Sequence, residues 1–155
     1  MGVPSDAVLQ REAAMARYLV VAHQTLGCPE LRTALTERTD GGKATFHLLV
    51  PEHHGGLGLT YTDAQARAVA RDALAHAQAD LASHGFFTTG EIGEASPVDA
   101  VATVLERDGA DPYAAVIVST LPHGISRWLR LDAPSQIRRR FGIEVIHVVG
   151  HLVNA

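Results

Sequence analysis

Short apolar runs rich in β-branched residues recur along the chain, and turn residues bound each of them. Four runs are almost uninterrupted, and one is weaker because a glycine-containing stretch follows it. Runs of this length and composition predict strands that are buried on both faces of a sheet. The five predicted strands cover Tyr18–Ala22, Phe46–Val50, Phe86–Thr89, Ala114–Val118 and Val145–Val149.

Helical signals separate the predicted strands. The strongest is the pair Thr62 and Gln65, which has the spacing of a capping box and precedes apolar residues at helical intervals. Ser96 followed by Pro97 is a second N-terminal signal, because serine caps a helix and proline suits its first turn. The four predicted helices begin near Pro29, Thr62, Ser96 and Ser126 and stop at Gly41, Gly85, Gly109 and Gly142.

This alternation of strands and helices predicts an α/β fold. Right-handed crossovers would join the strands into one doubly wound domain, with a five-stranded parallel sheet and helices on both faces. The segment 1–16 is expected to form a short helix or arm, and residues 17–155 the α/β domain. The chain contains no linker or internal repeat, so a single domain is predicted.

Composition narrows the functional classes. The net charge is −4 with a single lysine, Lys43, so no broad nucleic-acid surface is expected. The single cysteine, Cys28, excludes an intramolecular disulfide and suits a reducing compartment. With no long apolar run and no N-terminal signal pattern, we expect a cytoplasmic protein that does not enter a membrane.

Polar residues follow two of the predicted strands, where a parallel sheet of this kind binds its ligands. His23 and Thr25 follow the first strand, and Ser119 begins a loop after the fourth that extends through His123 to Arg127. Hydroxyls, imidazole and guanidinium are groups that bind a phosphate or carboxylate. The sequence therefore predicts a site for a small anionic ligand at this edge.

The loop after the fourth strand also carries a family resemblance. Its pair Ser126-Arg127, followed by a helix and the last strand Val145–Val149, resembles the C-terminal half of the universal stress protein family. The resemblance extends more thinly to the first two strands and to Gly90, and it spans most of residues 17–149. It implies the strand order 3-2-1-4-5.

Family members that bind ATP carry the pattern G-x-x-G-x9-G-[ST] after the fourth strand and usually an aspartate at the end of the first. One alignment matches Gly124 to the second glycine. The other two glycine positions then hold Leu121 and Pro134, and Ser135 keeps the hydroxyl. If the alignment is anchored on Ser126-Arg127 instead, the final pair of the pattern is Leu131-Asp132. His23 occupies the aspartate position. The sequence thus departs from the pattern at both places.

The resemblance implies a regulatory or stress-response module that binds ATP, AMP or another small phosphorylated ligand. It also implies a homodimer formed through the last strand. Loss of nucleotide binding would leave an interaction module, and a histidine-dependent hydrolase is a further alternative. The predicted ligand site comprises Ala22, His23, Thr25, Val50, Ser119, Thr120, His123, Gly124, Ser126, Arg127 and Ser135.

Several histidines and the cysteine allow more than one interpretation. With the family strand order, His23 and His123 would be neighbours, either as an anion clamp, as two ligands of a transition metal, or as ordinary polar loop residues. His47 and His147 lie within apolar runs, which favours hydrogen-bonded sheet residues. Cys28, beside a helix start, is either a buried small residue or a reactive thiolate.

Overall fold

The computed structural model describes residues 16–39, 43–52, 62–122 and 126–151. Strands and helices alternate along the chain, as the hydrophobic pattern predicts. The strands are β1 (Ala16–Val21), β2 (Ala44–Pro51), β3 (Phe87–Gly93), β4 (Ala115–Thr120) and β5 (Val145–Val149). The helices are α2 (Pro29–Thr39), α3 (Asp63–Ser83), α4 (Pro97–Asp108), α5 (Arg127–Arg130) and α6 (Ala133–Phe141).

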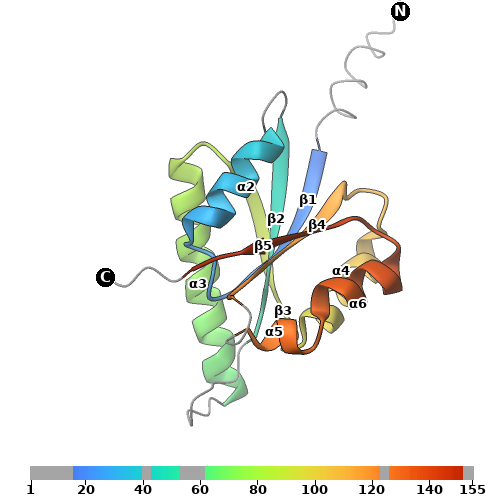
Figure 1. The fold of residues 1–155 in the computed structure, drawn as a ribbon. Helices are drawn as coiled ribbons and strands as arrows, with labels where there is room; N and C mark the ends of the chain where they lie inside the picture. Colours follow the sequence, from blue (N-terminus) through green and yellow to red (C-terminus); the bar gives the residue numbers. More distant parts are fainter. Residues whose placement is uncertain (1–15, 40–42, 53–61, 123–125, 152–155) are drawn as a thin grey trace, which may run out of the picture.

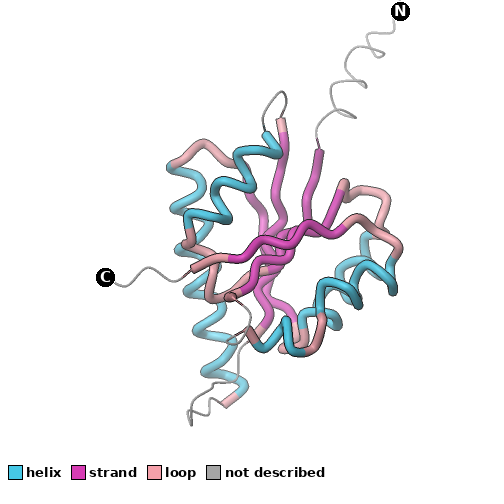
Figure 2. The backbone as a smooth tube through the Cα atoms, in the orientation of Figure 1, coloured by secondary structure: helices cyan, strands magenta, loops and turns pink. Residues whose placement is uncertain are grey.

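All five strands form one parallel sheet in the order β3-β2-β1-β4-β5. Figure 1 shows α2 and α3 on one side of this sheet and α4 and α6 on the other, and Figure 2 shows the strands enclosed between the two helical layers. The predicted doubly wound α/β fold is therefore confirmed. Because the strands run in parallel, all their carboxyl ends lie at one edge of the sheet.

Each face of the sheet has its own hydrophobic core. Alternate residues of β1 separate the two: Leu19 and Val21 pack with the α4 and α6 side, while Val20 packs with the α2 and α3 side. All three are fully buried. This burial on both faces explains why the central strands are uninterrupted apolar runs in the sequence.

The helix starts that the sequence predicts are present. Thr62 accepts the backbone N–H of Gln65, and the Gln65 side chain accepts the backbone N–H of Thr62, which completes the capping box of α3. Ser96 caps α4 and accepts a bond from Asp99 N, with Pro97 in the first turn. These caps satisfy N–H groups that would otherwise have no partner within the helix.

The third strand is longer than predicted. The prediction ended it at Thr89, whereas β3 continues through Gly90 to Gly93. Both glycines are places where another element approaches the strand closely: a Cβ on Gly90 would lie 2.5 Å from Leu74 Cδ1, and one on Gly93 would lie 2.7 Å from Ala100 Cβ. In this strand glycine therefore marks close packing by α3 and α4 rather than the end of the element.

The prediction of one helix between Ser126 and Phe141 is wrong, because this segment forms two separate helices, α5 and α6. Asp132 lies between them in the left-handed conformation, with φ of 54°. Pro134 explains the break, since a proline in the interior of one continuous helix would remove a backbone donor and clash with the preceding turn. At the start of a new helix, Pro134 is well tolerated.

The predicted arm over residues 1–16 lies outside the described residues except for Ala16, which begins β1. Within the described part of the chain, no helix has both the length and the apolar character required to cross a membrane.

Candidate functional site

A cleft of about 290 Å³ opens at the carboxyl ends of the strands, between the loop after β1 and the segment after β4. The sequence predicts ligand-binding residues here from two chain segments separated by almost a hundred positions. The fold brings both segments to the cleft, which is lined by the predicted residues His23, Thr25, Ser119, Thr120, Ser126 and Arg127.

The bottom of the cleft consists of Thr25, Ser119 and Thr120, which we call the hydroxyl floor. Thr25 Oγ1 and Ser119 Oγ are 2.6 Å apart and form a buried hydrogen bond. Two hydroxyl groups carry two hydrogens, and the bond between them uses one. The pair therefore retains one O–H donor for an acceptor in the cleft.

Within the hydroxyl floor, Thr120 is the member that is bonded to the edge strand of the sheet. Its Oγ1 lies 2.8 Å from His147 Nε2, and His147 belongs to the edge strand β5. The interpretation of His147 as a hydrogen-bonded sheet residue is confirmed. Gly150 N also donates to Thr120 O at 2.8 Å, so Thr120 is held at both its side chain and its backbone.

The segment after β4 turns into α5 at Ser126. Ser126 Oγ accepts the backbone N–H of Leu129 at 3.2 Å, which leaves its own hydroxyl hydrogen available. Arg127 follows and is exposed at the cleft, with Trp128 half-buried behind it against the core. A hydroxyl donor and a guanidinium thus occur side by side, an arrangement suited to an oxyanion.

Not all of the predicted site residues are among the described residues that line the cleft. Ala22 and Val50 are fully buried at the ends of β1 and β2, so only their backbone can face a ligand. Ser135 lies on α6 and is not among the described residues that line the cleft. His123 and Gly124 fall outside the described residues, as do His53 and His54.

Glu52 is a cleft residue that the sequence reasoning missed. It follows β2 directly, and its side chain is only 12% exposed. Its carboxylate lies 3.5 Å from Arg67 Nη2 of α3. The available signal was its position, because a residue just beyond β2 lies at the same sheet edge as His23.

Cys28 is a buried thiol, which agrees with its interpretation as a buried small residue. Its side chain is 3% exposed, and Sγ donates to His151 O at 3.2 Å. Burial raises the pKa of the thiol, and the nearby Glu30 charge raises it further. Cys28 is therefore a protonated packing residue and not a reactive thiolate.

A second hollow, of about 590 Å³, lies on the other side of His23, between α2 and α3. Its charged lining includes Arg32, Asp72 and Asp80, and Arg32 Nη1 lies 3.7 Å from Asp80 Oδ2. The carboxylates there make this hollow less suited to an anion than the first cleft.

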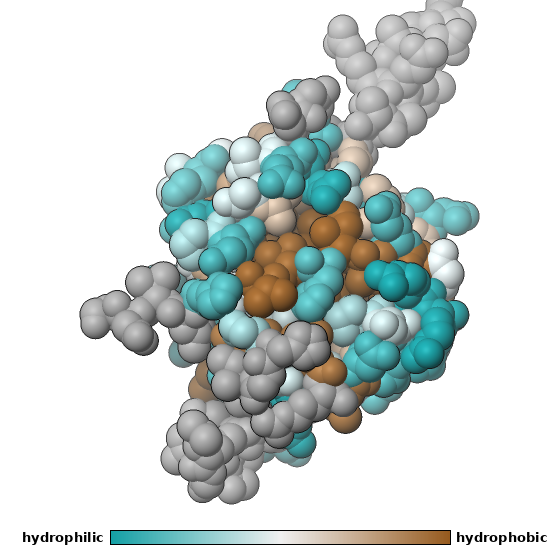
Figure 3. All heavy atoms as spheres, viewed as in Figure 1, coloured by the Kyte–Doolittle hydropathy of each residue, from teal (hydrophilic) through white to brown (hydrophobic). Residues whose placement is uncertain are grey.

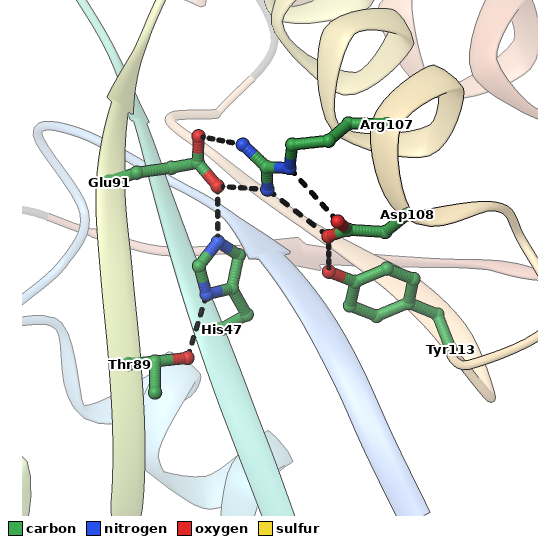
Figure 4. Close-up of polar contacts among 6 residues, drawn as sticks. All are labelled: His47, Thr89, Glu91, Arg107, Asp108 and Tyr113. Carbon is green, nitrogen blue, oxygen red and sulfur yellow. Dashed lines mark hydrogen bonds and ion pairs between the residues drawn. The ribbon is translucent and has the colours of Figure 1, made fainter.

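A separate polar network lies between β2, β3 and α4, and Figure 4 shows its six residues. His47 Nε2 is 2.6 Å from Glu91 Oε2, and Arg107 makes two hydrogen bonds to the same carboxylate, at 3.0 and 2.7 Å. Arg107 also contacts Asp108, which accepts the Tyr113 hydroxyl at 2.8 Å. We call His47, Thr89, Glu91, Arg107, Asp108 and Tyr113 the polar network.

The members of the polar network satisfy one another. A carboxylate only accepts, so His47 Nε2 donates to Glu91, and in the neutral ring Nδ1 accepts the Thr89 hydroxyl hydrogen at 2.7 Å. Arg107 holds the pKa of Glu91 below its ordinary value, with a further contribution from His47. The interpretation of His47 as a hydrogen-bonded sheet residue is confirmed.

Arg107 and Tyr113 lower the pKa of the Asp108 carboxyl, as Arg107 and His47 lower that of Glu91. The Arg107 hydrogen bonds and the Tyr113 hydroxyl hold the pKa of Asp108 well below its ordinary value. Burial and the bond to Asp108 raise the pKa of Tyr113 to about 12. Ionised carboxylates and a neutral phenol are thus the stable forms in the folded protein.

Among the described residues, no group of three or more His, Cys, Asp or Glu side chains converges as a metal site. The predicted pair of His23 and His123 remains a prediction, since His123 is outside the described part. In comparisons of the sequence with protein-family models and with curated proteins, neither a family nor a relative was matched.

Proposed function

We propose that this protein is a binding module of the universal stress protein type, with a regulatory or stress-response role, that holds a nucleotide or another small phosphorylated ligand in the cleft over the hydroxyl floor. The observation that carries the proposal is the buried pair Thr25 and Ser119, 2.6 Å apart at the end of β1 and β4, with one O–H donor to spare. Buried polar groups that do not satisfy one another fully are suited to a ligand.

The charge of the surrounding groups supports an anionic ligand. Arg127 supplies a guanidinium at the cleft, and Ser126 supplies a hydroxyl donor beside it. Ser96 also lines the cleft as the N-cap of α4, so the positive end of that helix dipole opens toward the same space. These groups favour a phosphate over a neutral ligand.

Two positions where the family pattern has glycine hold larger residues in this chain, which favours one phosphate over a chain of three. Leu121 lines the cleft and Pro134 is buried in α6, at the positions where the family pattern has glycines. A glycine lets backbone N–H groups approach a phosphate, and these side chains do not. Within this proposal AMP and small phosphate esters bind more tightly than ATP.

Isothermal titration tests the proposal directly. The ligands are AMP, ADP, ATP and inorganic phosphate, each with and without magnesium. We expect binding of at least AMP or phosphate, and a loss of about tenfold in affinity for Arg127→Ala, because a charge-assisted hydrogen bond contributes about that much. Arg139→Ala on α6 is the matched control. No heat change with any ligand from folded protein would contradict the proposal.

An interaction module without a ligand is the second candidate. Leu121 at the cleft and Pro134 in α6 favour it, because both occupy positions of the phosphate pattern. The same titration separates the two candidates, since an interaction module gives a flat response to every ligand in wild type and variant alike.

The proposal includes a homodimer formed through β5. This strand is the edge of the sheet next to β4, and Ile146, Val148 and Val149 are only half-buried. Figure 3 shows apolar atoms exposed over the middle of the face that β5 crosses in Figure 1. An edge strand with unpaired backbone groups and apolar side chains is suited to pairing with a second copy.

Light scattering tests the dimer. We expect a dimer at micromolar concentration and a shift to monomer for Val148→Lys, whose charge would be buried between the two copies. Thermal unfolding of the variant confirms that it is folded. A wild-type monomer across this concentration range would contradict the dimer.

The proposal assigns the protein to the cytoplasm, in keeping with its single cysteine.

A further inference from the structure

We propose that the cleft is bipolar, and that Glu52 selects phosphorylated ligands with an amino group at the end opposite the phosphate. This inference rests on the proposed function, because it assumes that the phosphate lies near Ser119 and Arg127. Glu52 then acts as a specificity-determining residue at the other end of the same cleft.

The backbone holds Glu52 in place. It follows the last residue of β2, and its N–H donates to Gly93 O of β3 at 3.0 Å, which continues the parallel pairing of the two strands. Its side chain lines the cleft and is largely buried. A carboxylate on a fixed backbone and in a confined space is a suitable selective group.

The order of the strands sets the distance between the two ends. Glu52 follows β2, while Ser119 and Arg127 belong to β4 and the segment after it, and β1 lies between these strands. Neighbouring strands are about 4.8 Å apart, so the two ends of the cleft are separated by about 10 Å. A nucleoside monophosphate has the required form, with a phosphate at one end and a base at the other.

Arg67 competes for the Glu52 carboxylate. Their closest N–O distance is 3.5 Å, longer than a good hydrogen bond, and the Arg67 side chain is half exposed. An ion pair with a long N–O distance and one solvent-exposed partner is weak, so a ligand amino group can replace Arg67 at the buried carboxylate. Two carboxylate oxygens offer several acceptor positions, which a donor such as –NH₂ can occupy.

The carboxylate discriminates by repulsion as well as by attraction. An exocyclic amino group donates to Glu52, whereas a carbonyl oxygen in its place would face the carboxylate with its own lone pairs. Sites with a buried polar group reject analogues that leave it unpaired. The ligand class is therefore a nucleoside monophosphate with an amino-substituted base.

Two matched pairs of probes test the inference, AMP with IMP and CMP with UMP, because each pair exchanges an amino group for a carbonyl oxygen. In isothermal titration of the full chain we expect the amino member to bind about tenfold more tightly or better, the effect of one hydrogen bond to a charged group. Glu52→Gln should reduce that ratio to below about threefold, since an amide can turn either its oxygen or its NH₂ toward the base.

Arg67→Ala is the opposing variant, because it removes the competing guanidinium. The amino preference should rise above that of the wild type, while Arg71→Ala, one turn further along α3 and exposed, should leave the ratio unchanged. Opposite shifts for the two partners of one ion pair are not expected from a general loss of stability.

The outcomes separate this inference from the proposed function. If no nucleotide and no inorganic phosphate binds, the proposed function itself fails. If phosphate alone binds, or if both members of each pair bind equally and Glu52→Gln changes nothing, the anion site stands and the role of Glu52 is overturned.

Discussion

The polar network and the cleft are two polar regions of one sheet. They differ in whether their polar groups satisfy one another completely or keep a donor for another molecule. In the polar network, His47, Glu91 and Arg107 bond to one another, and each carboxylate has a cation beside it. In the cleft, Thr25 and Ser119 bond to each other but keep a donor, and Arg127 faces open space. The first region stabilises the fold, and the second is available to a ligand.

This difference shows that polar composition alone does not identify a site. Both regions contain a histidine, an arginine and hydroxyl groups, and the polar network contains carboxyl and phenol groups with shifted pKa values. Shifted pKa values often indicate functional sites, but structural ion pairs produce them too. What distinguishes the cleft is that its donors face a cavity.

The largest expected effect comes from removing the carboxylate that joins β3 to α4. Glu91→Ala leaves the buried His47 without its acceptor and Arg107 without two hydrogen bonds. We expect a loss of about 2 to 3 kcal/mol in the free energy of unfolding, measured by urea denaturation. Glu106→Ala, exposed on α4, is the control, and an equal effect of both variants would refute a structural role for the network.

Acid should weaken the polar network by a smaller amount. The lowered pKa of Glu91 means that its ionised form stabilises the fold, fully above the ordinary pKa of 4.5 and progressively less as the pH falls below it toward the folded-state value. Asp108 adds in the same direction. Urea denaturation at pH 7 and pH 3 should therefore show a smaller difference for Glu91→Gln than for the wild type.

A change in the cleft should affect stability less and binding more. Thr25→Val replaces the hydroxyl that pairs with Ser119, so we expect a loss of about 1 kcal/mol in unfolding free energy. Affinity for the phosphate ligand should also fall in isothermal titration, because Ser119 keeps its own hydrogen but loses the partner that orients its hydroxyl. A variant that unfolds easily but binds normally would place Thr25 with the structural residues.

The smallest effect is expected at the end of the polar network. Tyr113→Phe removes one hydrogen bond to Asp108 and should cost about 0.5 to 1 kcal/mol. The pKa of Tyr113, raised from 10 to about 12, means that its neutral form stabilises the fold below pH 10 and that this stability is lost as the pH rises toward 12. Unfolding free energies at pH 9 and pH 11 should show this alkaline decrease in the wild type and not in the variant.

Much of the fold could be predicted because its signals are local. The capping box of α3 needs only Thr62 and Gln65, and each buried strand is recognised from its own apolar residues. The break between α5 and α6 also had a local signal, Pro134, which the prediction overlooked. The end of the third strand was mispredicted because a distant element decided it. Taken alone, Gly90 indicates a turn, yet it lies inside β3. The position requires glycine because Leu74 of α3 packs against the backbone there.

The candidate site was predicted in part for a similar reason. The rule that ligands bind beyond the carboxyl ends of parallel strands selected Thr25, Ser119 and Arg127, all of which line the cleft. Ser135 was predicted from the family pattern instead, which was aligned along the sequence without knowledge that a new helix, α6, begins before Ser135. The prediction omitted Glu52, whose role depends on the shape of the cleft.

The sequence by itself determined the alternating elements, their caps and the edge of the sheet where polar residues gather, because these depend on periodicity and on residues a few positions apart. Only the tertiary structure decided which polar groups satisfy one another. His47 meets Glu91 across 44 positions, and Thr25 meets Ser119 across 94. Such pairs depend on strand register and helix packing, which join distant segments and leave no short pattern in the chain.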